Sequence, residues 1–289
     1  MNGGRLGGEN GANAGGGTRS ERVGLVGVAK AFGRRGRQGA LPVLDDVDLS
    51  VAGGEFVAVL GPSGCGKSTL LRLIAGLDRP TAGEVRLGGQ PVTGVDARCA
   101  IVFQEPRLLP WRSVAANVAL GARGRATATK PEALLAQVGL DGFAAAYPHQ
   151  LSGGMAQRAG LARALIGEPR VLLLDEPFAA LDALTRLRMQ DLLAGICRQW
   201  RPTVVMVTHD VDEALTLADR IVIMGPRPAR VVATIAVPTL RPRDRADPAL
   251  ARLRAEILGF FGFGTGTGIA PAATRREDAR HDEREAAIA

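Results

Sequence analysis

At positions 61–69 the chain reads Gly61-Pro62-Ser63-Gly64-Cys65-Gly66-Lys67-Ser68-Thr69, which fits the pattern G-x-x-x-x-G-K-[ST]. The short apolar run 56–60 precedes this stretch and is typical of a fully buried strand. Leu70, Leu71 and Ile74 follow it at helical spacing. We therefore expect a buried strand, a tight glycine-rich loop and a helix, in that order.

A loop in this position forms an anion site. Successive backbone N–H groups of the loop and the free N–H groups at a helix N-terminus point at phosphate oxygens. Lys67 adds a positive charge for the β- and γ-phosphates, and the Ser68 hydroxyl can ligate Mg²⁺. The chain has only three lysines, Lys30, Lys67 and Lys130, so a chance match to the pattern is rare.

Polar side chains also follow three other apolar runs. Gln104 follows 100–103, the pair Asp175 and Glu176 ends 171–176, and His209 follows 204–207. Ligands bind at the carboxyl ends of strands in an open α/β sheet, so we expect these groups at one edge. There Asp175 would hold Mg²⁺, Glu176 would polarise an attacking water, and His209 would contact the γ-phosphate. Taken alone, His209 is better interpreted as a structural histidine.

Two further features have a plain and a functional interpretation. Phe32 is a lone aromatic residue before a loop, and it is either an edge-of-core side chain or a ring stacked on adenine. The run Leu108-Leu109-Pro110-Trp111 is either a partner-binding patch or a loop tucked under helices.

Composition limits the function. No apolar run approaches the roughly 20 residues of a membrane-spanning helix, and no signal peptide is recognised, so we expect a cytoplasmic protein. The net charge of +7 permits nucleic acid as a partner, but the arginines are scattered and aromatic residues make up only 4%. We therefore expect no nucleic-acid binding. The three cysteines have no C-x-x-C spacing, which disfavours a zinc site.

Periodicity and glycine content divide the chain into three parts. We predict a disordered glycine-rich tail at 1–21, one α/β domain at 22–258, and a disordered tail at 259–289. Helices at 114–120 and 131–138 indicate an inserted helical subdomain at about 106–160. Within it Ser152 is a helix cap, and Met155, Ala159, Ala162 and Ile166 share one face of the helix that follows.

Over about residues 22–258 the chain resembles the ATP-binding subunit of ABC transporters, on motifs in the family's order: GPSGCGKST at 61–69, Gln104, LSGGM at 151–155, LLLDEP at 172–177, Ala180-Leu181-Asp182 and His209. The presence of LSGGM between GPSGCGKST and LLLDEP distinguishes this family from other P-loop NTPases. The resemblance implies a RecA-like core with an antiparallel β subdomain and an inserted α-helical subdomain. It also implies Mg²⁺-dependent ATP hydrolysis at the interface of a head-to-tail homodimer.

The resemblance also assigns roles to residues. Phe32 looks like the adenine-stacking residue, Gln104 the link from Mg²⁺ and water to the transporter, Glu176 the general base and His209 the switch histidine. Each ATP would lie between residues 61–69 of one chain and Ser152, Gly153, Gly154 and Asp182 of the other. The chain departs from the family at Met155, Ala156 and Ala180, where polar residues are usual, which puts some cross-dimer contacts in doubt.

The segments FQEPRLLPW, YPHQLSGGM, FAALDALTR and PRPARVV look like the importers of the nitrate, sulfonate and taurine group. This implies a peripheral subunit on the cytoplasmic face of the cell membrane, two separate permease subunits and an extracytoplasmic solute-binding protein. Three alternatives remain open: the ATPase of another importer, a non-transport ABC ATPase acting on nucleic acid, and a catalytically inactive scaffold. The last would be expected to lack Lys67 or Glu176, and both are present.

Overall fold

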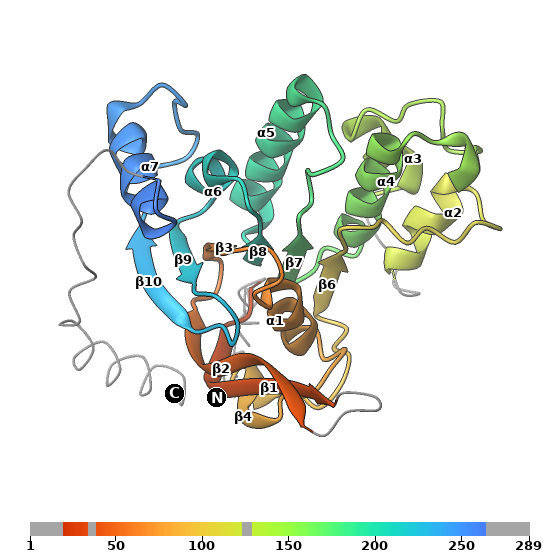
Figure 1. The fold of residues 1–289 in the computed structure, drawn as a ribbon. Helices are drawn as coiled ribbons and strands as arrows, with labels where there is room; N and C mark the ends of the chain where they lie inside the picture. Colours follow the sequence, from red (N-terminus) through yellow and green to blue (C-terminus); the bar gives the residue numbers. More distant parts are fainter. Residues whose placement is uncertain (1–19, 34–38, 123–128, 264–289) are drawn as a thin grey trace, which may run out of the picture.

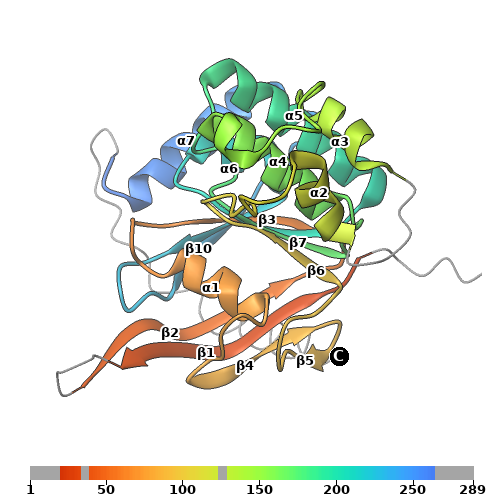
Figure 2. The same cartoon turned by 90° about the vertical axis from the view of Figure 1, so that its right-hand side faces the viewer.

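Two β-sheets carry the fold of this computed structural model, which describes residues 20–33, 39–122 and 129–263. Most of the two predicted tails lies outside these ranges. The smaller sheet is antiparallel, in the order β2-β1-β4-β5; Figure 1 shows β2, β1 and β4, and Figure 2 also shows β5. Its strands are β1 (Val23–Gly33), β2 (Ala40–Val51), β4 (Ala82–Leu87) and β5 (Gln90–Pro91).

The larger sheet has six strands in the order β10-β9-β3-β8-β7-β6. All neighbours pair in parallel except β10, which lies antiparallel at the edge. These strands are β3 (Phe56–Leu60), β6 (Cys99–Val102), β7 (Val171–Asp175), β8 (Thr203–Val207), β9 (Arg220–Met224) and β10 (Val231–Ala236). Strands β3, β7 and β8 are buried on both faces, which explains their unbroken apolar sequences.

Of the α-helices in the described ranges, one lies inside the molecule and six lie on the outer face of the parallel sheet. Figure 2 shows α1 (Lys67–Ile74) between the two sheets. The other helices are α2 (Val114–Ala119), α3 (Pro131–Gln137), α4 (Gly153–Leu165), α5 (Ala183–Trp200), α6 (Val211–Leu217) and α7 (Pro248–Phe260). None of the helices in the described ranges is long and apolar enough to span a bilayer.

Alternation along β3 divides the hydrophobic core in two. Phe56, Ala58 and Leu60 belong to the cluster that the outer helices cover. Val57 and Val59 point the other way, into the cluster that includes α1 and the antiparallel sheet. The helix that starts at the glycine-rich loop and the helix that starts after Ser152 therefore pack on opposite faces of one sheet.

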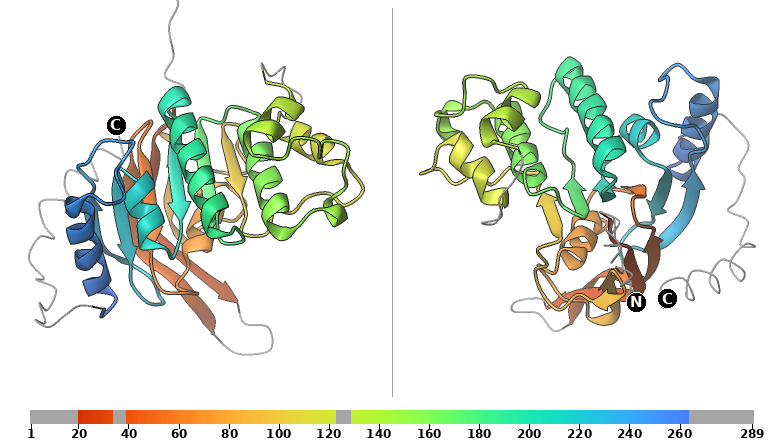
Figure 3. Two further views of the ribbon diagram at one scale, coloured as in Figure 1. Left: turned by 90° about the horizontal axis from the view of Figure 1, so that it is seen from above. Right: turned by 180° about the vertical axis from the view of Figure 1, so that it is seen from behind.

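Helices α2, α3 and α4 group together at one end of the molecule, opposite α7 (Figure 3). Buried Asn117 organises the loop before α2: its side chain accepts from Leu109 N at 2.7 Å and donates to the carbonyl oxygens of Leu109, Arg112 and Ser113. Each interpretation of the run 108–111, a tucked loop or an exposed patch, fits one part of this loop. Leu108 packs against the core, whereas Trp111 is 72% exposed.

Most predicted elements are confirmed, with small shifts at their ends. The helix predicted at 131–138 is α3, and Gly139 after it has a φ of 68°. The sequence analysis did not predict α5 and α6. Helix α5 buries Met189, Leu193, Ile196 and Cys197 at helical spacing, so the signal was present. Helix α6 has seven residues, as α3 does, but it has neither the proline at its start nor the glycine after its end that marked α3.

Candidate functional site

The glycine-rich loop joins β3 to α1, as predicted. Gly66 is the N-cap of α1, with a φ of 126° and no side chain to bond the first N–H groups. A Cβ on Gly66 would lie 2.8 Å from Val43 Cγ1 and 2.9 Å from Leu44 Cδ2. Glycine is therefore required here for both conformation and space. The consequence is a helix start whose N–H groups receive no side-chain cap and remain available to an anion.

Lys67 points back into this loop. Its ammonium donates to the carbonyl oxygens of Gly61 at 2.7 Å and Pro62 at 3.1 Å, and the residue is 6% exposed. Cys65 lies under the loop in the core and is 2% exposed. The loop 61–69 therefore surrounds a positive charge that is held by the carbonyl dipoles of Gly61 and Pro62.

Ser68 and Asp175 place two oxygen atoms that could ligate a metal beside that charge. Ser68 Oγ donates to Asp175 Oδ1 at 2.9 Å, and Asp175 is 8% exposed. Burial raises the pKa of Asp175 above its ordinary value, the hydrogen bond from Ser68 lowers it, and the charge of Glu176 raises it. A hydroxyl and a carboxylate are ligands that suit Mg²⁺, which takes few protein ligands and fills its shell with phosphate and water oxygens. No group of three or more His, Cys, Asp and Glu side chains in the described ranges could hold a metal by itself.

Glu176 lies at the centre of a second group at the same sheet edge. Gln104 Nε2 donates to Glu176 Oε2 at 3.3 Å, and His209 Nδ1 lies 3.4 Å from Glu176 Oε1. The three side chains follow β6, β7 and β8, whose parallel carboxyl ends meet there. Glu176 has a φ of 48°, a strained value for a residue with a side chain. The strand ends therefore bring together an acid, an amide and an imidazole.

Phe32 lies at the end of β1 on the antiparallel sheet and is 39% exposed. Lys30 Nζ lies 4.8 Å from its ring centroid and forms an ion pair with Asp78 at 2.6 Å. The exposed ring belongs to neither hydrophobic cluster, and its stacking on adenine stays a prediction.

The second predicted binding segment lies at the start of α4. Ser152 Oγ accepts from Met155 N at 3.3 Å, so the serine caps its own helix. Ser152 and Gly153 are exposed, and a Cβ on Gly154 would lie 3.1 Å from Ala180 O. Asp182 then caps α5 by accepting from Thr185 N at 3.0 Å. The structure thus brings the segments 152–154 and 180–182 together, on the sheet face opposite α1.

Sequence reasoning missed Arg227 as a neighbour of the glycine-rich loop. Its guanidinium donates to Gly64 O at 2.7 Å across 163 positions of sequence. The segment that carries it is held against β2, because Ala229 N donates to Val43 O at 2.9 Å and Asp45 N donates to Ala229 O at 3.0 Å. In the sequence, PRPARVV indicated only a group of transporters. The two arginines of this segment were the available signal for a contact with the loop.

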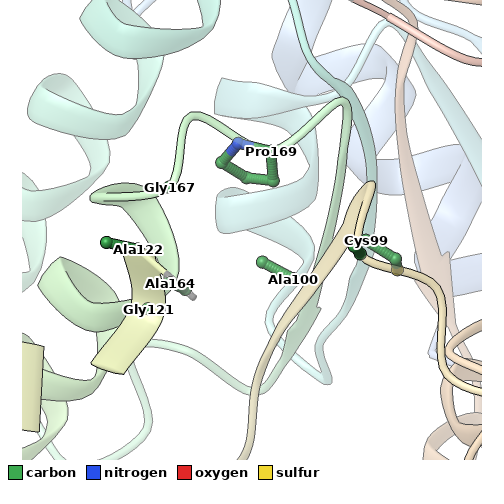
Figure 4. A pocket seen from close by; sticks show the side chains of 8 residues that line it. Cys99, Ala100, Gly121, Ala122, Ala164, Gly167 and Pro169 are labelled. Atoms are coloured by element: carbon green, nitrogen blue, oxygen red, sulfur yellow. The ribbon is translucent and has the colours of Figure 1, made fainter. Parts of the chain in front are cut away.

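A small cavity lies away from these groups, next to the amino-terminal end of β6 (Figure 4). It measures about 10 Å³, and its walls include Cys99, Gly121, Ala164 and Pro169. That volume is about enough for a single water. Small side chains here let the short 3₁₀ turn Leu120–Ala122 approach α4, so the cavity is a packing feature.

Comparison with known proteins agrees with this geometry. The ABC transporter family model matches residues 44–179. The aliphatic sulfonates import ATP-binding protein SsuB 2 of Burkholderia cenocepacia is 54% identical over 76% of this chain and 82% of its own length. SsuB 1 of Nocardia farcinica is 52% identical over 84% of this chain and 93% of its own length.

A solved structure of the ATP-binding cassette MJ0796, a dimer bound to ADP and Pi, is 33% identical. It superimposes with a TM-score of 0.68 over 75% of this chain and 100% of its own length. An antiparallel sheet, a parallel sheet and a helical group form the architecture of an ABC ATPase. On this identity and coverage, the chain belongs to the ABC transporter family as an ATP-binding subunit that hydrolyses ATP.

Proposed function

We propose that this chain powers the import of a small oxyanion, an aliphatic sulfonate first and taurine or nitrate next, through a separate membrane permease. The observation that carries the ATPase part is the convergence of Gln104, Glu176 and His209 beside the loop 61–69. The choice of solute rests on the relatives, which are named as aliphatic sulfonate import proteins.

In this proposal the loop 61–69 binds the nucleotide. Its backbone N–H groups surround the β- and γ-phosphates, and Lys67 exchanges its carbonyl partners for phosphate oxygens. Ser68, Asp175 and Gln104 would hold Mg²⁺, which would neutralise charge on the phosphates. Phe32 stacks on the adenine, a role supported by its exposed ring.

Glu176 is the proposed general base. Its carboxylate takes a proton from the water that attacks the γ-phosphate, while Gln104 and His209 fix the two carboxylate oxygens. The imidazole side chain is 63% exposed, and in its protonated form, with a proton on both nitrogens, Nε2 would donate to a γ-phosphate oxygen. The strained backbone of Glu176 supports a functional position, because such strain persists where the surrounding structure imposes it.

The active unit is a head-to-tail homodimer in this proposal. The segment 152–154 and Asp182 lie on the sheet face opposite α1, so they complete the site of a second copy more readily than their own. A single chain would then bind ATP but hydrolyse it slowly. The MJ0796 relative has been observed as a dimer with ADP and Pi, which supports this arrangement.

We infer that two permease subunits and an extracytoplasmic solute-binding protein complete the transporter, with this chain on the cytoplasmic face of the membrane. The exposed Trp111, held out by the loop that Asn117 organises, supports a docking role for that loop. The solute would pass through the permease and never contact this chain.

One experiment tests the proposal. The chain is reconstituted in liposomes with the permease and binding protein of its own operon, and ATPase activity is measured with alkanesulfonates, taurine and nitrate. We expect stimulation by at least one alkanesulfonate. ATPase activity that no solute stimulates would overturn the proposed substrates but not the nucleotide chemistry, and stimulation by DNA would favour the nucleic-acid alternative.

A further inference from the structure

Arg186 links two loops that the proposed mechanism needs. It lies in the first turn of α5, where its backbone N–H donates to Asp182 O at 2.8 Å. Its side chain reaches both ways: Nη2 donates to Leu181 O at 3.2 Å, and Nη1 lies 3.5 Å from Asp210 Oδ2. One guanidinium therefore joins the loop that ends at Asp182 to the residue that follows His209.

Behind this contact lies a buried carboxylate that the mechanism does not use. Glu213 is 4% exposed, and its Oε2 accepts from Thr208 Oγ1 at 2.7 Å. Its other oxygen, Oε1, lies 3.8 Å from Arg186 Nε. Burial raises the pKa of Glu213, while the Thr208 hydrogen bond and the charge of Arg186 act in the opposite direction.

The same network holds both neighbours of His209. Thr208 Oγ1 accepts from Asp210 N at 3.1 Å, and Asp210 Oδ1 accepts from Asp212 N at 2.8 Å and Glu213 N at 3.2 Å. The backbone around His209 is thus fixed by Thr208 on one side and Asp210 on the other. A movement of Arg186 would therefore change the position of His209 through Thr208 or through Asp210.

The contacts of Arg186 are loose in the single chain. Charge-assisted hydrogen bonds are about 2.7–2.9 Å long, whereas its two ion pairs measure 3.5 and 3.8 Å. Its Nε is buried and has no hydrogen-bond partner within the described residues. Arg186 and Asp210 also line a cavity of about 470 Å³ between α5, α6 and the segment 245–254. The guanidinium therefore has both an unmet donor and space in which to move.

We propose that Arg186 is a positioning residue that makes hydrolysis depend on the second copy. Engagement of the Asp182 loop by that copy shifts the Leu181 carbonyl, Arg186 tightens on Asp210 and Glu213, and His209 is set against Glu176 and the γ-phosphate. A planar guanidinium can address the three partners at once, which a lysine ammonium cannot. This inference rests on the proposed shared site.

The test compares Arg186→Ala, Arg186→Lys and a matched control, Arg188→Ala, which alters an exposed arginine on the same helix. ATP affinity is measured on the full chain by calorimetry, and kcat and KM for ATP are measured with Mg²⁺. We expect Arg186→Ala to lower kcat about tenfold and to leave ATP affinity within about twofold. Arg186→Lys should recover part of kcat because it keeps the charge, and Arg188→Ala should match the native chain.

A second variant guards against misfolding. Glu213→Gln keeps an acceptor for Thr208 and removes the charge that faces Arg186, so it should also lower kcat, and the double variant with Arg186→Ala should be no worse than the worse single variant. An unchanged kcat in Arg186→Ala would overturn the inference. A decrease in both ATP affinity and Tm in the two Arg186 variants would also overturn the inference, because that result would indicate a folding role alone. If the native chain itself shows no ATPase activity that Glu176→Gln removes, the proposed function fails first.

Discussion

The starts of α1 and α4 are both glycine-rich, yet they differ in how complete they are. At α1 the loop surrounds a buried Lys67, with Ser68 and Asp175 already hydrogen-bonded beside it. At α4, Ser152 is exposed and caps its own helix. Within the described residues, its side chain has no hydrogen bond to a cation or a carboxylate. In the proposed function, one helix start is an assembled phosphate site, and the other is half of a site that a second copy completes.

The difference has a physical origin in the N-cap residue. Gly66 has no side chain, so the first N–H groups of α1 stay available to a ligand. Ser152 supplies a hydroxyl that already accepts one N–H of α4, and that hydroxyl still has a proton to donate. Because the two starts lie on opposite faces of the parallel sheet, the proposed shared site joins the loop 61–69 of one copy to the segment 152–154 of a second copy.

Glu176→Gln gives the largest expected effect and tests whether both helix starts are needed. We expect the hydrolysis rate to fall on the order of 10³-fold, since a general base contributes about 10²–10⁴. ATP affinity should persist, because Gln keeps the contact with Gln104. Light scattering with ATP should then show a stable dimer. Exclusively monomeric protein would contradict the shared site. Glu132→Gln, at an exposed position on α3, is the control.

Lys67→Ala tests the α1 half alone. Removal of the buried ammonium should weaken ATP binding by about 100-fold, because a hydrogen bond to a charged group contributes about 1.5–3 kcal/mol. Calorimetry on the isolated chain measures this directly. Retained affinity would exclude the loop 61–69 as the phosphate site. Lys130→Ala removes an exposed lysine at the start of α3 and should bind ATP as the native chain does.

Ser152→Ala tests the α4 half, and Ser113→Ala is a matched control that removes the cap of α2. Each loses one cap and should lower the free energy of unfolding by about 1 kcal/mol. Only Ser152→Ala should also lower ATPase activity, by about tenfold, through the lost hydroxyl donor. ATP affinity of the single chain should stay unchanged in both. Equal ATPase activity in the two variants would make Ser152 a cap and nothing more.

Asp175→Asn gives the smallest expected effect and sharpens the view of α1 as a site built for a ligand. Since burial raises the pKa of Asp175, its ionised form is destabilising in the folded, nucleotide-free chain. The variant should raise Tm of the nucleotide-free chain at neutral pH on the order of 2 °C.

The pH dependence of that variant has a definite sign. The native carboxylate costs stability above its folded pKa, and this cost disappears as pH falls and both states become protonated. The difference in Tm between variant and native chain should therefore narrow as pH is lowered toward the ordinary value of 3.8. Asp191→Asn, at an exposed position on α5, should show no such narrowing. A difference that widens at low pH would contradict the raised pKa.

Long apolar runs made the parallel sheet predictable, because a strand that is buried on both faces needs apolar side chains at nearly every position. Glycine and lysine spacing made the loop 61–69 predictable for a similar reason, since few sequences allow backbone N–H groups to converge. The short helix α6 escaped prediction because it lacks the starting proline and the following glycine that marked α3, which is equally short. Asn117 and Glu213 escaped because a polar residue in a sequence does not show whether it is buried.

By itself the sequence determined the family, the α/β class and the identity of the side chains at the strand ends, because these depend on local patterns of residues that follow one another. Only the tertiary structure decided which distant groups meet. It placed Gln104 and His209 on the two oxygens of Glu176, Arg227 on the glycine-rich loop, and Arg186 between the Asp182 loop and the His209 segment. Such contacts join residues up to 163 positions apart, and they form only when parallel pairing and packing bring strand ends and loops to a common edge.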